Sequence, residues 1–278
     1  MIYKKFLLKD LSDEFKDSNA FFEFYELDYT KEFGVRNCPR PGLLIIPGGA
    51  YKFVSYREGE PIALRMISEG FNCFVLTYTV NEKYPTPQKE VAFTMNYINE
   101  HRSEFDLLDI NLSLIGFSAG GHLVASIGEY YPELADSLHV NKENIKPYAV
   151  VLGYPVITSD KKYYNRETIV TIAGDDQELL EKMSLEKHVT SDFPPTYLFS
   201  TYDDNAVPIK NSELFIEALK KNKVPFKAHI FDSGYHGGSL FTRGVYREYD
   251  DKCLSAEPNG IWVKEACEFI FNRVYKIK

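Results

Sequence analysis

The sequence predicts an α/β protein with an open, mostly parallel sheet and helices on both faces. Two observations support this class. Short runs rich in β-branched and aromatic residues alternate with longer helical patterns, and most of the runs are apolar throughout, as in strands buried on both faces. In chain order the expected strands are GLLIIP (42–47), NCFVLTYTV (72–80), NLSLIGF (111–117), YAVVLGYPV (148–156), PTYLFST (195–201) and FKAHIFD (226–232).

Five helices are expected between and after these strands, at residues 58–69, 87–104, 119–131, 208–222 and 259–274. The fourth is the clearest, because Ile209, Leu214, Phe215, Ala218 and Leu219 form one apolar stripe. Pro208 stands early in it, and lysines stand late, where the helix dipole favours positive charge. The alternation of strands and helices implies right-handed βαβ units.

The ends and the middle of the chain bear on its domain count. Residues 1–34 are aromatic and acidic, and a peripheral strand is expected near FFEFYELDY. The sequence has no repeat and no low-complexity linker, which predicts one domain over residues 1–278. Residues 157–194 carry a weak helical signal between two expected strands, where so long a connection is unusual. Two interpretations stay open for this segment: a small lid over a site, or a crossover helix with long loops.

Composition and charge exclude several classes of protein. The 278 residues are 44% hydrophobic and 26% charged, which is ordinary for a soluble globular protein. The formal net charge of −8 comes without any cationic block, so nucleic acid is not an expected partner. No apolar run is long enough to cross a bilayer and the N-terminus lacks a signal-peptide core, so no membrane partner and a cytoplasmic location are expected. The oligomeric state has no signal in the sequence.

The four cysteines, Cys38, Cys73, Cys253 and Cys267, are scattered along the chain. They form no CxxC pair and have no closely spaced histidine partners, so no metal site is expected. Buried free thiols are the expected state of these residues. No organic cofactor is expected either, because the chemistry described next requires none.

The stretch LIGFSAGGH (114–122) carries the strongest chemical signal. Within it, Gly116 to Gly120 fits the G-x-S-x-G pattern, with an apolar strand before it and a helical pattern after it. Glycines two residues on either side of Ser118 allow a sharp turn that leaves the hydroxyl at the carboxyl end of the sheet. Ser118 is therefore the predicted nucleophile, against the alternative of a tight turn with a structural serine.

A serine nucleophile needs a base, and the base follows the acid in this chain order. His236 lies in the glycine-rich loop SGYHGG directly after an expected strand, and it is the predicted base. His122 is only four residues after Ser118, but one turn along the helix it projects away, which favours packing. His229 is interpreted as a core or flanking residue, and His188 lines a site only if its segment is a lid.

The acid is expected after a later strand, where STYDDNAVP (200–208) offers two candidates. Either Asp203 or Asp204 could accept the imidazole N–H and stabilise the imidazolium. Spacing leaves the choice open, and Asp-Asp-Asn is also good turn chemistry.

Donors for an oxyanion come from backbone amides. One is the amide of Ala119, which follows the nucleophile. The loop IIPGGAY (45–51) comes after the first core strand, and its adjacent glycines let amides face a ligand, so Gly49 and Ala50 are the other predicted donors.

Taken together, these stretches resemble an α/β-hydrolase of the acetyl-esterase type, similar to acetylxylan esterases and BD-FAE-like feruloyl esterases. The supporting segments are PGGAY, REGEPIALRMISEGFNCFVLTYTV, LIGFSAGGHLVAS, GYPVIT, FPPTYLFSTYDDNAVPIKNSELFIEAL and VPFKAHIFDSGYHGGSL, which cover most of residues 41–241. The resemblance implies the α/β-hydrolase fold and assigns the triad to Ser118, Asp203 and His236. The sequence departs from the family's pattern at two places. The oxyanion loop has Pro47 and Ala50 where many relatives carry HGGG. The base motif reads HGG, whereas HG followed by a large apolar residue is commoner.

The expected activity is hydrolysis of a short-acyl ester, with acetyl and a carbohydrate alcohol implied by the resemblance, through an acyl-enzyme on Ser118. The expected partner is a small-molecule ester. Tyr51, Phe53, Tyr56, Tyr78, Tyr84 and Tyr154 are candidates for stacking on a sugar, although plain core or surface positions are commoner for such residues. Arg57 and Glu58 are interpreted as a structural ion pair at a helix start.

Three alternative functions remain. A prolyl-oligopeptidase-like peptidase shares the elbow but usually carries a large extra domain, and a kynurenine-formamidase-like amidase has a similar size. A ligand-binding module without turnover would be expected to lose one of Ser, Asp and His, and all three are present.

Overall fold

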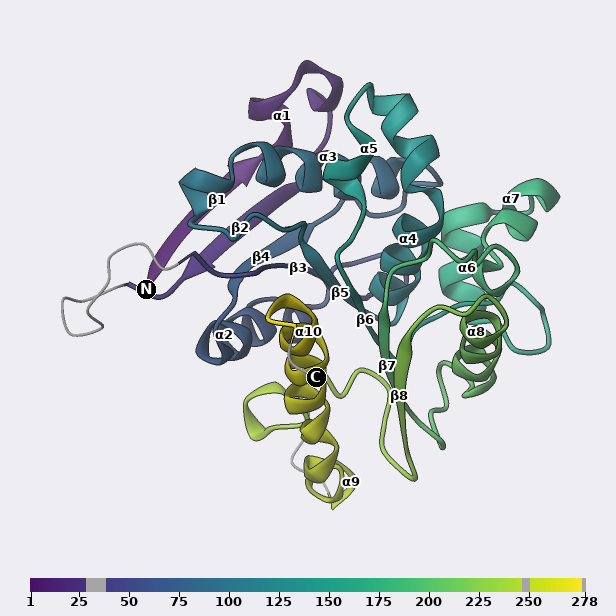
Figure 1. Ribbon diagram of the computed structural model, residues 1–278. Helices are drawn as coiled ribbons and strands as arrows, with labels where there is room; N and C mark the ends of the chain where they lie inside the picture. The colour runs from purple at the N-terminus through teal and green to yellow at the C-terminus, as the bar shows by residue number, and fades with distance from the viewer. Residues whose placement is uncertain (29–38, 247–250, 277–278) are drawn as a thin grey trace.

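The computed structural model describes residues 1–28, 39–246 and 251–276, which form one eight-stranded sheet with helices around it (Figure 1). The strand order is β1-β2-β4-β3-β5-β6-β7-β8. The strands are β1 (Ile2–Leu7), β2 (Phe21–Glu26), β3 (Gly42–Ile46), β4 (Asn72–Thr77), β5 (Ser113–Phe117), β6 (Val150–Gly153), β7 (Thr196–Thr201) and β8 (Phe226–Phe231). Strands β3 to β8 are parallel, and β2 is antiparallel to both β1 and β4. The predicted fold class, a mostly parallel sheet, is confirmed.

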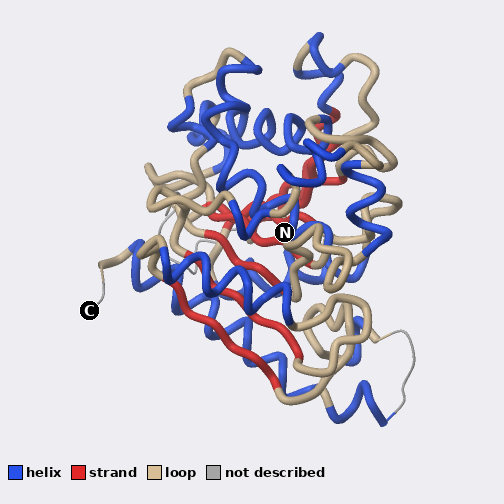
Figure 2. Tube along the Cα trace, turned by 90° about the vertical axis from the view of Figure 1, so that its right-hand side faces the viewer, coloured by secondary structure: helices blue, strands red, loops and turns tan. Residues whose placement is uncertain are grey.

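The helices cover both faces of the sheet, as Figure 2 shows from the side. Residues alternate along each buried strand: in β3, Leu44 and Ile46 belong to one hydrophobic cluster, whereas Leu43 and Ile45 belong to the other. The first cluster packs under α3 (Thr86–Glu100), α4 (Ala119–Leu138) and α8 (Lys210–Lys221). The second packs under α2 (Glu60–Glu69) and α10 (Trp262–Val274). Shorter helices are α1 (Leu8–Leu11), α5 (Lys142–Ile145), α6 (Arg166–Ala173), α7 (Gln177–Lys182) and α9 (Asp251–Ser255).

Strand β1 and helix α4 are among the elements that differ from the expectation. Strand β1 was not predicted, and its burial explains why: it is an edge strand whose middle residues, Tyr3, Lys4 and Lys5, are exposed, so it lacks an apolar run. Helix α4 was expected to end at Tyr131, but it continues past Pro132 to Leu138. Leu134 and Leu138 are buried and continue the apolar face of the helix across the proline.

The segment 157–194 connects β6 to β7 and contains α6, α7 and the 3-10 turn η5 (Leu185–Lys187). It packs beside α4, where the Tyr130 hydroxyl donates a hydrogen bond to the carbonyl of Lys182 at 2.7 Å. The segment also borders the site described below. Movement of this segment as a lid stays a prediction, as does the count of one domain.

Three of the four cysteines lie in the described part of the chain, and all three are buried. Cys73 and Cys267 are buried free thiols and Cys253 is buried, while Cys38 lies outside the described residues. Among residues 1–28, 39–246 and 251–276, no helix is long and apolar enough to cross a membrane.

Candidate active site

Ser118 lies in a sharp turn between β5 and α4, at the carboxyl edge of the parallel strands. Its backbone has φ 53° and ψ −118°, a conformation that side chains rarely adopt. The flanking glycines are required by contact: a Cβ atom on Gly116 would lie 2.2 Å from the carbonyl oxygen of Gly120, and one on Gly120 would lie 2.2 Å from that of Ile46. The strand-turn-helix context predicted for the pattern is confirmed.

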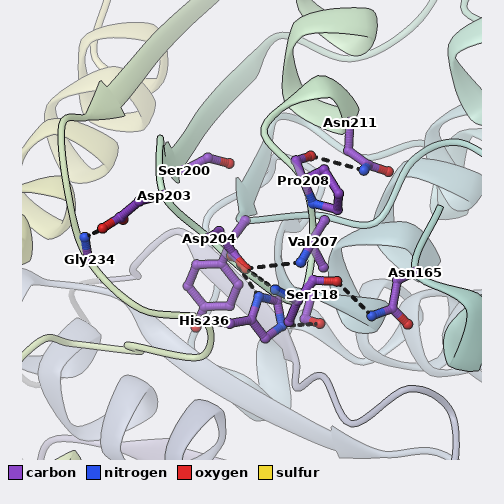
Figure 3. A network of polar contacts seen from close by, with 12 residues as sticks. Ser118, Asn165, Ser200, Asp203, Asp204, Val207, Pro208, Asn211, Gly234 and His236 are labelled. Carbon is purple, nitrogen blue, oxygen red and sulfur yellow. Dashed lines mark hydrogen bonds and ion pairs between the residues drawn. The ribbon is translucent and has the colours of Figure 1, made fainter. Parts of the chain in front are cut away.

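His236 meets Ser118 from the loop that follows β8. The Ser118 hydroxyl lies 2.8 Å from Nε2 of His236, and Nδ1 lies 2.7 Å from a carboxylate oxygen of Asp204 (Figure 3). Because a carboxylate only accepts, Nδ1 carries the proton and Nε2 is left to accept from Ser118. The edge of the ring packs against Tyr154, with centroids 5.1 Å apart. The structure therefore brings together a serine, a histidine and an aspartate in the order that general-base catalysis needs.

The assignment of Asp203 as the acid is wrong in this geometry. The Asp204 side chain is 1% exposed, and its other oxygen accepts from the amides of Ala206 and Val207 at 2.8 and 2.9 Å. The Asp203 side chain instead points toward the loop after β8, where it accepts a hydrogen bond from the amide of Gly234 at 2.8 Å (Figure 3). The two aspartates follow β7 in a turn, and their side chains reach different partners, so only Asp204 faces His236.

The loop after β3 lies directly beside the nucleophile. Gly49, Ala50 and Tyr51 all have positive φ, at 125°, 55° and 58°, and a Cβ atom on Gly49 would lie 2.0 Å from the carbonyl oxygen of Phe53. Gly49 and Ala50 border the same cavity as Ser118. Among the described residues, no acceptor is bonded to the amides of Gly49 or Ala50. Ala119 begins α4, so its amide also lacks an acceptor within the helix. The three predicted oxyanion donors are thus adjacent to Ser118, and their role stays a prediction.

A buried carboxylate, Glu58, braces this loop. It is 2% exposed and accepts from the amide of Gly48 at 2.9 Å and from the hydroxyl of Tyr154 at 2.7 Å. The Tyr154 hydroxyl in turn accepts from the amide of Ser239, in the loop that carries His236, at 3.0 Å. The interpretation of Arg57 and Glu58 as an ion pair is wrong, because in the described part of the chain Arg57 forms no ion pair within 4.0 Å. The role of Glu58 was missed, since its partners are 10 and 96 residues away in sequence.

His122 supports the same loop from behind, as the packing interpretation predicts. The Tyr51 hydroxyl donates to its Nδ1 at 2.9 Å, and its Nε2 donates to the carbonyl of Met183 at 3.1 Å. Burial lowers the pKa of His122 to about 4, so the ring is neutral at neutral pH. His229 lies on the other side of the sheet against Glu265, and His188 does not border the cavity at Ser118.

The cavity at Ser118 has a volume of about 480 Å³. Segment 157–194 contributes Asn165, Glu167 and Thr168 to its wall. Tyr51, Tyr78 and Tyr154 are buried and unavailable for stacking on a sugar, whereas Phe53 is exposed and borders the cavity. In the part of the chain that the structure describes, no three His, Cys, Asp or Glu side chains gather as metal ligands would.

Comparison with known proteins identifies the family of this chain. The family model BD-FAE matches residues 34–219. The chain belongs to the BD-FAE family. Over 213 residues this BD-FAE chain is 33% identical to endo-1,4-beta-xylanase B of Butyrivibrio fibrisolvens, covering 73% of the chain and 32% of that protein. Over 227 residues it is 26% identical to an acetylxylan esterase of Xylanibacter ruminicola, covering 79% of the chain and 44% of that protein. The chain thus spans less than half the length of either curated relative.

Solved structures resemble the BD-FAE chain over nearly its full length. A carboxylesterase from Lactobacillus plantarum is 28% identical with a TM-score of 0.80, covering 91% of this chain and 92% of that one. An α/β hydrolase from a deep-sea metagenome library is 28% identical with a TM-score of 0.76, covering 100% and 99%. The predicted α/β-hydrolase fold and the predicted resemblance to acetyl-esterase-type hydrolases are confirmed.

Proposed function

We propose that the chain is a serine carboxylesterase that hydrolyses short-acyl esters, with acetyl as the acyl group and a carbohydrate as the alcohol. The observation that carries the proposal is the hydrogen-bonded series Ser118, His236 and Asp204, with distances of 2.8 and 2.7 Å. The names of its relatives, an acetylxylan esterase and a carboxylesterase among them, support the acetyl and ester assignments.

In the first half of the reaction, His236 takes the proton of Ser118 as the hydroxyl oxygen attacks the ester carbonyl. The negative charge on the carbonyl oxygen would be stabilised by the amides of Gly49, Ala50 and Ala119, a contribution of about 3 to 4 kcal/mol for a typical donor. Asp204 holds the imidazole in the required tautomer and stabilises the imidazolium. The C–O bond to the alcohol then breaks, and Nε2 of His236 returns the proton to the leaving oxygen.

In the second half, water replaces the alcohol. His236 takes a proton from the water as it attacks the acyl-enzyme, and the same proton is returned to the Ser118 oxygen as the acid is released. All groups needed for both halves come from four loops at the carboxyl edge of the sheet. The proposed mechanism therefore uses only side chains and backbone amides of this chain.

The test is hydrolysis of p-nitrophenyl acetate, butyrate and octanoate by the wild-type protein and by Ser118→Ala. Loss of nearly all acetate turnover in the variant is expected, together with a preference for acetate over octanoate. Ser68→Ala, a change at an exposed position of α2, is the matched control and should hydrolyse acetate at the wild-type rate. Equal rates in wild type and Ser118→Ala would refute the proposed nucleophile. Release of acetate from acetylated xylo-oligosaccharides then tests the carbohydrate assignment.

A further inference from the structure

Arg57 borders the candidate active site from η3 (Tyr56–Glu58), between the loop after β3 and helix α2. Its side chain lies beside the loop that carries His236: a Cβ atom on Gly237 would be 3.1 Å from Nη2 of Arg57. Gly237 has φ of +73°, so a larger residue there would be strained as well as crowded against the guanidinium. The backbone carbonyl of Arg57 also accepts from the hydroxyl of Ser239, which joins η3 to the same loop.

The charge of Arg57 has no carboxylate partner in residues 1–28, 39–246 and 251–276. Two other charged side chains border the cavity besides His236, and both have partners. Both oxygens of Glu58 accept hydrogen bonds, from Gly48 and from Tyr154, and Glu167 forms an ion pair with Lys52 at 2.7 Å. Among the described residues, none therefore accepts a hydrogen bond from this half-buried guanidinium, which borders the cavity next to the reacting groups.

The position of Arg57 indicates which part of a substrate it meets. In an ester hydrolysis His236 delivers its proton to the leaving oxygen, so the alcohol part must lie against His236. Gly237 follows His236 in the chain, the guanidinium of Arg57 lies beside Gly237, and all three residues border the same cavity. A planar guanidinium binds a carboxylate through two parallel hydrogen bonds and through the attraction of opposite charges. A neutral hydroxyl group offers neither the second hydrogen bond nor the charge.

We propose that Arg57 forms a subsite for a carboxylate carried on the alcohol part of the ester, so that the enzyme favours acyl esters of acidic alcohols such as uronic-acid-bearing sugars. The inference rests on the proposed esterase function and adds a substrate class to it. The subsite lies on the leaving-group side of Ser118 and does not involve the acyl group.

The experiment compares two acetyl esters that differ in charge and are similar in shape, 4-acetoxybenzoate and 4-acetoxybenzamide, in the wild type and in Arg57→Met. The quantity measured is the ratio of kcat/KM for the carboxylate to kcat/KM for the amide, because the intrinsic reactivity of each ester cancels between the two proteins. Arg57→Met should lower this ratio about tenfold to hundredfold, the size of a charge-assisted hydrogen bond. Arg57→Lys, which keeps the charge without the planar fork, should give an intermediate ratio.

Arg166→Met is the matched control. Arg166 is exposed on α6, next to cavity residues Asn165 and Glu167, but it does not border the cavity. Arg166→Met should leave the carboxylate-to-amide ratio of kcat/KM within about twofold of the wild-type ratio, since an exposed charge is screened by solvent. An unchanged ratio in Arg57→Met, or an equal fall in Arg57→Met and Arg166→Met, would overturn the proposal.

The amide ester separates this inference from the proposed function. If the wild type hydrolyses neither ester nor p-nitrophenyl acetate, the esterase proposal fails, and the subsite is tested by calorimetric binding of 4-hydroxybenzoate. Binding that weakens about tenfold in Arg57→Met would support the subsite. Equal binding by both proteins, or no binding by wild type, would overturn it.

Discussion

Buried carboxyl groups in two regions of the molecule have opposite surroundings. Around Ser118, Glu58 accepts two hydrogen bonds and Asp204 accepts three. On the outer part of α4, both carboxyl oxygens of Glu129 are buried without a hydrogen-bond partner in the described part of the chain. Burial raises the pKa of Glu129 well above its usual value, and the nearby Glu186 raises it further.

The difference shows which buried carboxyl groups the fold holds in a fixed orientation. A buried carboxylate with several donors stays in one orientation, and Glu58 and Asp204 each orient a loop of the candidate active site. A buried carboxyl without donors is held as the neutral acid, and it contributes little to positioning. The substitutions below test this contrast, beginning with the one that should reduce activity most.

Removing the group that Asp204 orients should have the largest effect. His236→Ala should lower kcat for p-nitrophenyl acetate by about 10⁵-fold or more, because general acid-base catalysis is lost in both half-reactions. His229→Ala is the control, since that ring lies against Glu265 and away from the cavity. Similar losses in both variants would contradict the assignment of the base.

Removing Glu58, which supports the loop after β3, should have the second-largest effect on kcat. Glu58→Ala leaves the amide of Gly48 and the hydroxyl of Tyr154 without their acceptor. The loop carrying Gly49 and Ala50 should lose its fixed position, and kcat should fall about 10²-fold, like the loss of one oxyanion donor. Glu58→Gln retains an acceptor for Gly48 and should recover part of the activity. A fall in stability with unchanged kcat would show that Glu58 only supports folding.

Tyr154→Phe should have a smaller effect on the same site. The ring that packs against His236 is kept, but the hydroxyl that joins Glu58 to Ser239 is lost. We expect kcat/KM for p-nitrophenyl acetate to fall about threefold to tenfold, since a typical hydrogen bond contributes about 1 kcal/mol. Tyr197→Phe, whose buried hydroxyl donates to the carboxylate of Glu265 away from the cavity, provides a control of the same chemistry. Equal losses in both would indicate general loosening of the core.

The smallest effect is expected in the second region, and it concerns stability. The folded protein keeps a proton on Glu129 at pH values where the unfolded chain, with a glutamate pKa of about 4.3, has lost it. The free energy of unfolding therefore falls as pH rises above about 4.3 and through the raised folded pKa. Glu129→Gln should remove this loss, raising stability by about 1 kcal/mol at pH 8 and little at pH 5.

Urea unfolding at both pH values measures this change, and Glu178→Gln, at an exposed position of α7, is the control. If the difference between wild type and Glu129→Gln were the same at pH 5 and pH 8, the neutral state of Glu129 would be refuted.

The parts of the site that local sequence determines could be predicted. The turn at Ser118 depends on glycines two residues away, and His236 follows its strand within a glycine-rich loop. Strands β3 to β7 were predicted for a similar reason, because strands buried on both faces are apolar throughout. Strand β1 was not predicted, because an edge strand with exposed lysines has no continuous apolar run.

The parts that depend on distant contacts could not be predicted. Asp203 and Asp204 are consecutive in a turn, and which one faces His236 depends on how the loop after β8 packs, with Gly234 bonded to Asp203. Glu58 gave no signal because an acid after a glycine-rich loop is common on surfaces. Its burial arises from β6 and the loop after β8, through Tyr154 and Ser239.

The central claim, that Ser118, His236 and Asp204 act as one unit, is tested most directly by the two adjacent aspartates. Asp204→Asn and Asp203→Asn change the same chemical group one residue apart, and kcat for p-nitrophenyl acetate is the measurement. Asp204→Asn should lower kcat about 10⁴-fold, because an asparagine favours the wrong tautomer of His236. Asp203→Asn should stay within about tenfold of wild type, because its amide oxygen can still accept from Gly234. A large loss in Asp203→Asn with near wild-type activity in Asp204→Asn would contradict the account.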